Sequence, residues 1–143
     1  MASGKPRAKR VAELQAAGRT KQSASTREWE ERNPLGYMLY QLRNNADRRG
    51  IQHSLTLQDL KDVWPADGKC PVFGVPLVLP KAASGKQPDR ASIDRIDRNH
   101  GYQKGNIAFM SWRANQIKGS ATSAELKAVA LWLERQERIR ELF

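Results

Sequence analysis

Cysteine, histidine and long apolar runs are scarce in this chain of 143 residues, which has one cysteine and two histidines. A single cysteine excludes an intramolecular disulfide and a zinc cluster built from cysteines alone. No apolar run approaches the roughly 18 residues that a membrane span needs, and the N-terminus lacks the apolar stretch of a secretory signal. We therefore expect a soluble, cytoplasmic protein with no membrane partner.

Acidic residues are also few, since 15 of them face 25 lysines and arginines, which leaves a net charge of +10. The excess lies in two segments, with net charges of +4 over residues 1–33 and +5 over residues 70–120. Such a charge balance favours a phosphate-rich partner, because each neutralised phosphate releases a counterion. Solubility alone would also explain a basic chain, but we expect nucleic acid.

The pattern of apolar residues predicts an α+β fold in one small domain, residues 31–143, behind a basic N-terminal arm. The arm, residues 1–30, has too little apolar surface to order itself and is expected to be flexible or partly helical. Asn33 and Pro34 mark the start of a helix over 34–49. Capping-box patterns start two more helices, at Thr56 with Asp59 and at Thr122 with Glu125. The last helix is expected over 122–141, and Trp112 and Trp132 are expected in the core.

The central block predicts a ββα unit over about residues 90–119. A strand is expected over 91–97, a turn after it, a second strand over 106–111 and a helix over 112–118 that ends at Gly119. A hairpin packed on a short helix can bring Asp94 and Asn115 together, although they are 21 residues apart. One carboxylate and one amide oxygen would leave most of a Mg²⁺ shell to water and phosphate.

The motifs D-R-I-D, G-Y-x-x-G-N and A-N-x-x-K within residues 92–118 resemble those of the HNH endonucleases, also called His-Me finger or ββα-metal nucleases. The likeness is to the small members common in bacteriophage genomes. It extends over about residues 43–126 and includes the segment K-C-P-V-F-G-V-P-L. It implies a ββα-metal finger flanked by helices, DNA as the partner and products with 5′-phosphate and 3′-hydroxyl ends. For a phage-encoded protein the location would be the host-cell cytoplasm.

The resemblance also implies roles for individual residues. Asp94 and Asn115 match the metal ligands, and Asn106 matches the asparagine that orients the general base or its loop. Arg95 stands where the family has its general-base histidine, so the chain has Asp-Arg in place of Asp-His. Phosphate contacts are expected from the surrounding cations Arg90, Lys104, Arg113 and Lys118.

Two cysteine pairs that bind a structural zinc in many family members are replaced here. Cys70, Phe73, Ser111 and Ala114 stand at these four positions. We therefore expect apolar packing in place of a structural zinc.

Without the histidine, His100 or Asp97 could take a proton from the attacking water, or a metal-bound water could attack without a protein base, because the metal lowers the pKa of a water that it binds. Arg95 could instead clamp the scissile phosphate with its fork of donors. Neighbours in a regular strand point to opposite faces, so Asp94 and Arg95 would both face the site only at a strand end or a bulge.

The sequence thus predicts an HNH-type endonuclease or nickase that hydrolyses DNA with one divalent ion, Mg²⁺ or else Mn²⁺, and acts as a monomer or a homodimer. The alternative is a DNA-binding module without catalysis on a decayed HNH scaffold.

Overall fold

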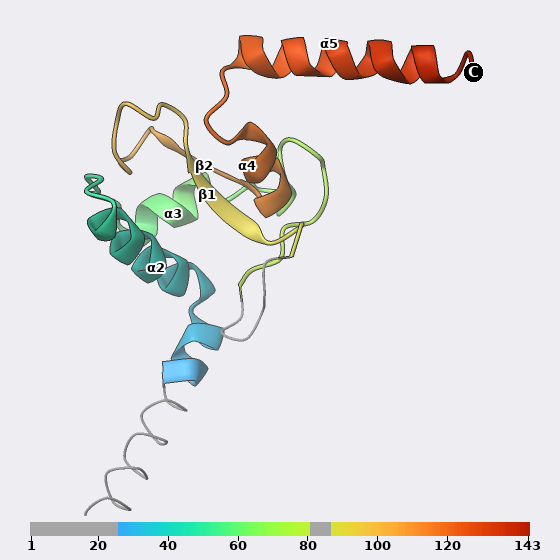
Figure 1. The fold of residues 1–143 in the computed structure, drawn as a ribbon. Helices are drawn as coiled ribbons and strands as arrows, with labels where there is room; N and C mark the ends of the chain where they lie inside the picture. The colour runs from blue at the N-terminus through green and yellow to red at the C-terminus, as the bar shows by residue number, and fades with distance from the viewer. Residues whose placement is uncertain (1–25, 81–86) are drawn as a thin grey trace, which may run out of the picture.

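The computed structural model describes residues 26–80 and 87–143, and it confirms a small α+β fold (Figure 1). Residues 26–32 are helical. Residues 1–25, which hold most of the predicted arm, and residues 81–86 lie outside the described part. The named elements that follow are α2 (Pro34–Arg48), α3 (Leu57–Val63), β1 (Ala91–Arg95), β2 (Ile107–Ser111), α4 (Trp112–Lys118) and α5 (Ser123–Arg140).

The two strands form an antiparallel hairpin in which Asp94 lies opposite Ala108. The first strand ends at Arg95, two residues earlier than predicted, because the Asp97 carboxylate accepts the Asn99 N–H at 2.9 Å and starts the turn. Helix α4 follows β2 without a linker. The Ser111 hydroxyl caps it by accepting the Ala114 N–H at 3.1 Å. The predicted strand, turn, strand, helix order is therefore present.

The core lies between the hairpin and the helices α2 and α3, which cover one side of it (Figure 1). Leu60 of α3 and Phe109 of β2 are almost completely buried, and Trp64 packs its edge on Phe109 with ring centroids 5.1 Å apart. The predicted capping box of α3 at Thr56 and Asp59 is confirmed. The remaining apolar side chains of this core are Met38, Leu39, Leu42, Leu55, Cys70, Leu77, Ala91, Ile107, Met110 and Ala114.

The loop between the strands is fixed to the segment that follows α2. Tyr102 donates its N–H to the Gln52 carbonyl and accepts the Ser54 N–H, both at 2.9 Å. A Cβ atom at position 101 would collide with the same Gln52 carbonyl, so Gly101 is required by this close approach. The hairpin loop is therefore held from both sides of Tyr102, which restrains the end of β1 where Asp94 lies.

Helix α5 extends away from the rest of the domain (Figure 1). Its predicted capping box at Thr122 and Glu125 is confirmed, but none of its side chains is buried. The expectation that Trp132 belongs to the core is wrong, since 54% of this residue is exposed. Trp112, at the start of α4, is partly buried.

Within residues 26–80 and 87–143 no helix has the length and hydropathy to cross a membrane.

Candidate metal and phosphate site

The face of β1 that looks toward α4 carries Ser92 and Asp94, since residues two apart in a strand share a face. Asn115 and Lys118 lie three residues apart on α4, on one face of that helix. Strand alternation and helix periodicity together therefore place four polar side chains in the space between β1 and α4.

Three contacts connect the strand to the helix there. The Lys118 ammonium lies 2.9 Å from Asp94 Oδ2 and 3.4 Å from the Arg95 carbonyl oxygen. The Asn115 amide donates to Ser92 Oγ at 2.6 Å. The Asp94 side chain is 14% exposed and that of Lys118 is 29% exposed, so this ion pair is shielded from water far more than an ordinary surface pair.

Asn106 is the most fully bonded of the predicted site residues. It is only 7% exposed, accepts the Asp97 N–H at 2.8 Å, and donates to the carbonyls of Asp97 at 3.0 Å and Gly101 at 2.9 Å. The side chain thus spans the hairpin loop from its start to its middle. Of the two roles implied by the resemblance, this geometry favours orientation of the loop.

His100 lies in the same loop, and its Nδ1 atom is 2.8 Å from Asp97 Oδ2. The Asn99 backbone N–H and this histidine hold the pKa of Asp97 below its ordinary value of 3.8. Asp97 therefore stays ionised at neutral pH and is a weak base. The pair is more than 45% exposed, and the imidazole ring of His100 bonds to Asp97 and not to Asp94 or Lys118.

Arg95 lies on the face of β1 opposite to Asp94. Its guanidinium donates to the carbonyls of Arg98 at 3.0 Å and His100 at 3.1 Å, and it lies 5.3 Å from the centre of the Tyr102 ring. These contacts hold the loop. The strand is regular up to its last residue, so the structure does not bring Arg95 together with Asp94.

The four predicted phosphate-binding cations are dispersed. Only Lys118 lies at the Asp94 site. Lys104 lies near the start of α3, where the pKa of Asp59 is lowered first by hydrogen bonds from Thr56 and, more weakly, by the Lys104 charge. Arg113 is exposed on the first turn of α4.

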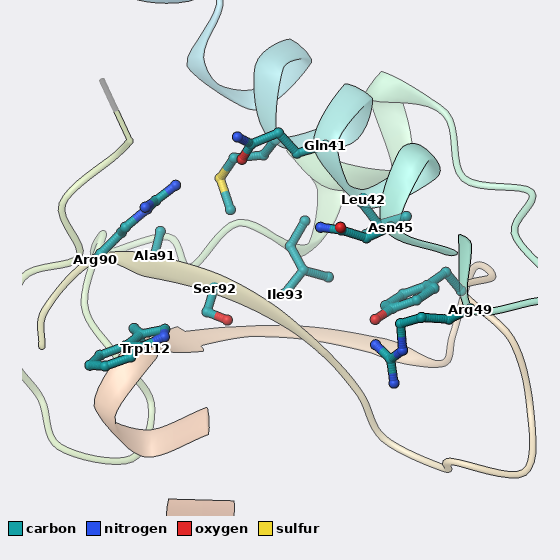
Figure 2. Close-up of a pocket in the computed structure, with 11 residues that line it drawn as sticks. Gln41, Leu42, Asn45, Arg49, Arg90, Ala91, Ser92, Ile93 and Trp112 are labelled. Carbon is teal, nitrogen blue, oxygen red and sulfur yellow. The ribbon is translucent and has the colours of Figure 1, made fainter. Parts of the chain in front are cut away.

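Arg90 lines a groove of about 420 Å³ between α2 and β1, to which Ser92 and Trp112 also contribute. Figure 2 shows Arg90 and Arg49 at the two ends of this groove, with Gln41 and Asn45 of α2 between them. Gln41, Asn45 and Arg49 follow one another at four-residue spacing, which is the signal that could have identified them as one polar stripe.

Of the four positions that match zinc ligands in the resembling family, Ser111 and Phe73 donate backbone hydrogen bonds to a third, the Cys70 sulfur. It accepts the Ser111 N–H at 3.2 Å, and Ser111 in turn caps Ala114. Burial raises the pKa of the Cys70 thiol, but hydrogen bonds from Ser111 and from the Phe73 and Val72 backbones outweigh burial and lower it. Of the four side chains only that of Cys70 is a usual zinc ligand, so these positions do not form a four-ligand zinc site.

Asp94 and Asn115 are the side chains between β1 and α4 whose chemistry suits a divalent ion of the Mg²⁺ type, since both offer hard oxygen ligands. The Lys118 ammonium is paired with the Asp94 carboxylate, so a metal would have to displace it. Among the described residues no three histidine, cysteine or acidic side chains cluster as a metal site. The two oxygens would therefore leave the remaining positions to water and phosphate.

Ser92 is the site residue that sequence reasoning missed, although it lies two residues before Asp94 in the predicted strand.

Comparison of the chain with models of known families, with curated proteins and with solved structures returns no match.

Proposed function

We propose that this protein is a metal-dependent DNA endonuclease or nickase of the HNH type. One observation carries the proposal: within a strand, turn, strand, helix unit, Asp94 of β1 pairs with Lys118 of α4, and Asn115 of α4 bonds to Ser92 of β1. The hydrogen bonds from Ser111 and Phe73 to the Cys70 sulfur support it, since these are three of the four positions at which many HNH proteins carry zinc ligands.

In this proposal Asp94 and Asn115 hold one Mg²⁺ or Mn²⁺ ion. When bound, such an ion neutralises the scissile phosphate and stabilises the charge that develops on the leaving oxygen. Lys118 leaves the Asp94 carboxylate and binds a neighbouring phosphate oxygen. Asn106 keeps the hairpin loop in place.

The proton of the attacking water has two candidate acceptors in this proposal. The first is His100. Asp97 has a lowered pKa and is itself a weak base, but it orients His100 through Nδ1, which leaves Nε2 of His100 free to accept a proton. The other acceptor is solvent, with the metal lowering the pKa of the water. Arg95 is assigned to the loop and not to the scissile phosphate, because its guanidinium is bonded to two loop carbonyls.

Purified protein is expected to nick supercoiled plasmid in Mg²⁺ or Mn²⁺ and to be inactive in EDTA. His100→Ala in the same assay decides between the two proton acceptors, because unchanged nicking removes His100 from the mechanism. Absence of nicking with every metal on duplex, branched and single-stranded DNA would contradict the proposal.

A second candidate is a DNA-binding module without catalysis, and the Asp94–Lys118 ion pair favours it. The lysine occupies the carboxylate that a metal would need. Such a module would bind DNA with the same affinity in EDTA as in Mg²⁺ and would never nick it. Its affinity would fall steeply with salt concentration, as expected for phosphate contacts.

Lys118→Met is expected to tighten Mn²⁺ binding in the absence of DNA, because the metal no longer displaces an ammonium group from Asp94. We expect a gain of roughly fivefold, which corresponds to an ion pair worth about 1 kcal/mol. Isothermal titration with Mn²⁺ measures it.

Lys104→Met is the matched control for this experiment. It removes the same charge from a residue near α3, away from Asp94, and should leave the Mn²⁺ affinity unchanged. Weaker Mn²⁺ binding by Lys118→Met than by Lys104→Met would show that the lysine supports the metal site and does not compete for it.

A further inference from the structure

Helix α5 has 18 residues, and none of its side chains is buried. It begins at a complete capping box, but most helical stability in proteins comes from tertiary packing of an apolar face, which α5 does not have within the described domain. The helix also extends away from the core (Figure 1). The covering that stabilises it is therefore expected to come from outside the described domain.

Helix α5 has an apolar stripe of five side chains, in which Val129 follows Leu126 by three residues, Trp132 and Leu133 follow Val129 by three and four, and Ile139 follows Trp132 by seven. Four of them are about half exposed: Val129 at 56%, Trp132 at 54%, Leu133 at 47% and Ile139 at 49%. Large exposed apolar patches mark interaction sites in soluble proteins. We call this set the α5 stripe, and its members are Leu126, Val129, Trp132, Leu133 and Ile139.

We propose that the α5 stripe binds the α5 stripe of a second copy of this chain, antiparallel, about a two-fold axis between Trp132 and Leu133. In that register Trp132 of one copy lies opposite Leu133 of the other. Leu126 lies opposite Ile139, and Val129 lies opposite Gln136. A two-fold interface requires that each pairing occurs twice, and this helix satisfies the requirement without an apolar side chain facing a charge.

Charge selects the same arrangement. Glu125 and Arg140 extend the α5 stripe at its two ends, four residues before Val129 and four residues after Gln136. The antiparallel register places Glu125 of one copy opposite Arg140 of the other, at both ends of the interface. Parallel pairing would place Glu125 opposite Glu125 of the second copy and Arg140 opposite Arg140, and these like charges repel. Glu125 accepts the Thr122 N–H through Oε1 at 2.9 Å and is exposed, so its carboxylate is accessible to the second copy.

The proposal does not rest on nuclease activity, because it follows from α5 alone. A second copy is the expected partner because, in the antiparallel register, no side chain of the α5 stripe faces a charge and Glu125 faces Arg140. A dimer would place two β1–α4 sites on one particle.

The test is the mass of the 143-residue chain in solution, by sedimentation equilibrium over a range of concentrations. The expected mass at high concentration is twice the 16.2 kDa of one chain. Leu133→Glu is expected to raise the dimer dissociation constant at least about tenfold, because it places two charges at the two-fold axis. Leu131→Glu is the matched control, since Leu131 is 58% exposed but lies on the opposite side of the helix.

A monomer at every concentration would overturn the proposal and would mean that another part of the chain, nucleic acid or a different protein covers the stripe. Equal weakening by Leu131→Glu and Leu133→Glu would also overturn it. Circular dichroism of both variants checks that the domain is folded.

Charge reversal tests the register itself. Glu125→Arg and Arg140→Glu should each weaken the homodimer roughly tenfold, because like charges then face each other at both ends. An equal mixture of the two variants should recover dimerisation, since each heterodimer again pairs opposite charges. Failure of the mixture to dimerise better than either variant alone would exclude the antiparallel register.

Discussion

Asp94→Asn is expected to slow plasmid nicking in Mg²⁺ at least about a hundredfold, because it removes the one negative charge that faces α4 in the site. The substitution keeps the size of the side chain and its ability to accept a hydrogen bond from Lys118. The expected loss therefore reports on the charge that a divalent ion needs and not on packing. Initial nicking rates at saturating Mg²⁺ measure it.

Asp62→Asn is the matched control, since it removes one negative charge from an exposed side chain of α3. It should nick at the wild-type rate. DNA binding by Asp94→Asn should be at least as strong as that of the wild type, because one charge that repels phosphate has been removed. Wild-type nicking by Asp94→Asn would remove the β1–α4 site from the chemistry.

Asn106→Ala is expected to lower the free energy of unfolding by about 2–4 kcal/mol, because it breaks three hydrogen bonds at a buried position. The Asp97 N–H and the carbonyls of Asp97 and Gly101 would lose their partner. The midpoint of thermal unfolding should fall by roughly 10 °C for a domain of this size. Differential scanning calorimetry measures both quantities.

Asn99→Ala provides the control for this substitution, because Asn99 is exposed in the same loop and contributes a backbone N–H to the Asp97 carboxylate. It should change the free energy of unfolding by less than about 0.5 kcal/mol. A similarly small effect of Asn106→Ala would mean that other contacts hold the loop. Asn106 would then have to be considered for a direct role at the phosphate.

Local signals predicted much of the fold. Both capping boxes are confirmed, at Thr56 and at Thr122, because a cap depends only on residues three positions apart. The order of the hairpin and α4 is also as predicted, because strand alternation, turn residues and the glycine that ends α4 are local signals too. Asn33 precedes α2 as predicted, but its side-chain amide donates to the Trp29 carbonyl and does not cap the helix. That contact depends on residues 26–32 being helical, which the pattern did not reveal.

The burial of a helix face was not predictable in the same way. The periodicity of α5 indicates an apolar stripe correctly, but a stripe does not specify what covers it. Trp132 was therefore expected in a core that it does not reach. For α2 the same kind of stripe does face the core, since Met38, Leu39 and Leu42 are buried.

The candidate site was predictable only in part. Strand alternation separates Asp94 from Arg95, and the motif order places Asn115 on the following helix. The pairing of Lys118 with Asp94 depends on how closely α4 packs on β1, which spacing along the chain does not determine. The contacts of Arg95 with the loop carbonyls and Tyr102 likewise depend on a loop that is fixed by Gln52 and Ser54, residues far away in the sequence.

Binding of Mn²⁺ measured by electron paramagnetic resonance tests the central claim most directly, because it does not require the right DNA substrate. The wild-type protein is expected to bind one Mn²⁺ per chain in a titration that extends to millimolar metal. Asp94→Asn and Asn115→Ala should lose this binding, and Asp62→Asn should keep it. Equal Mn²⁺ binding by all four proteins, or none by the wild type, would contradict a metal site between β1 and α4.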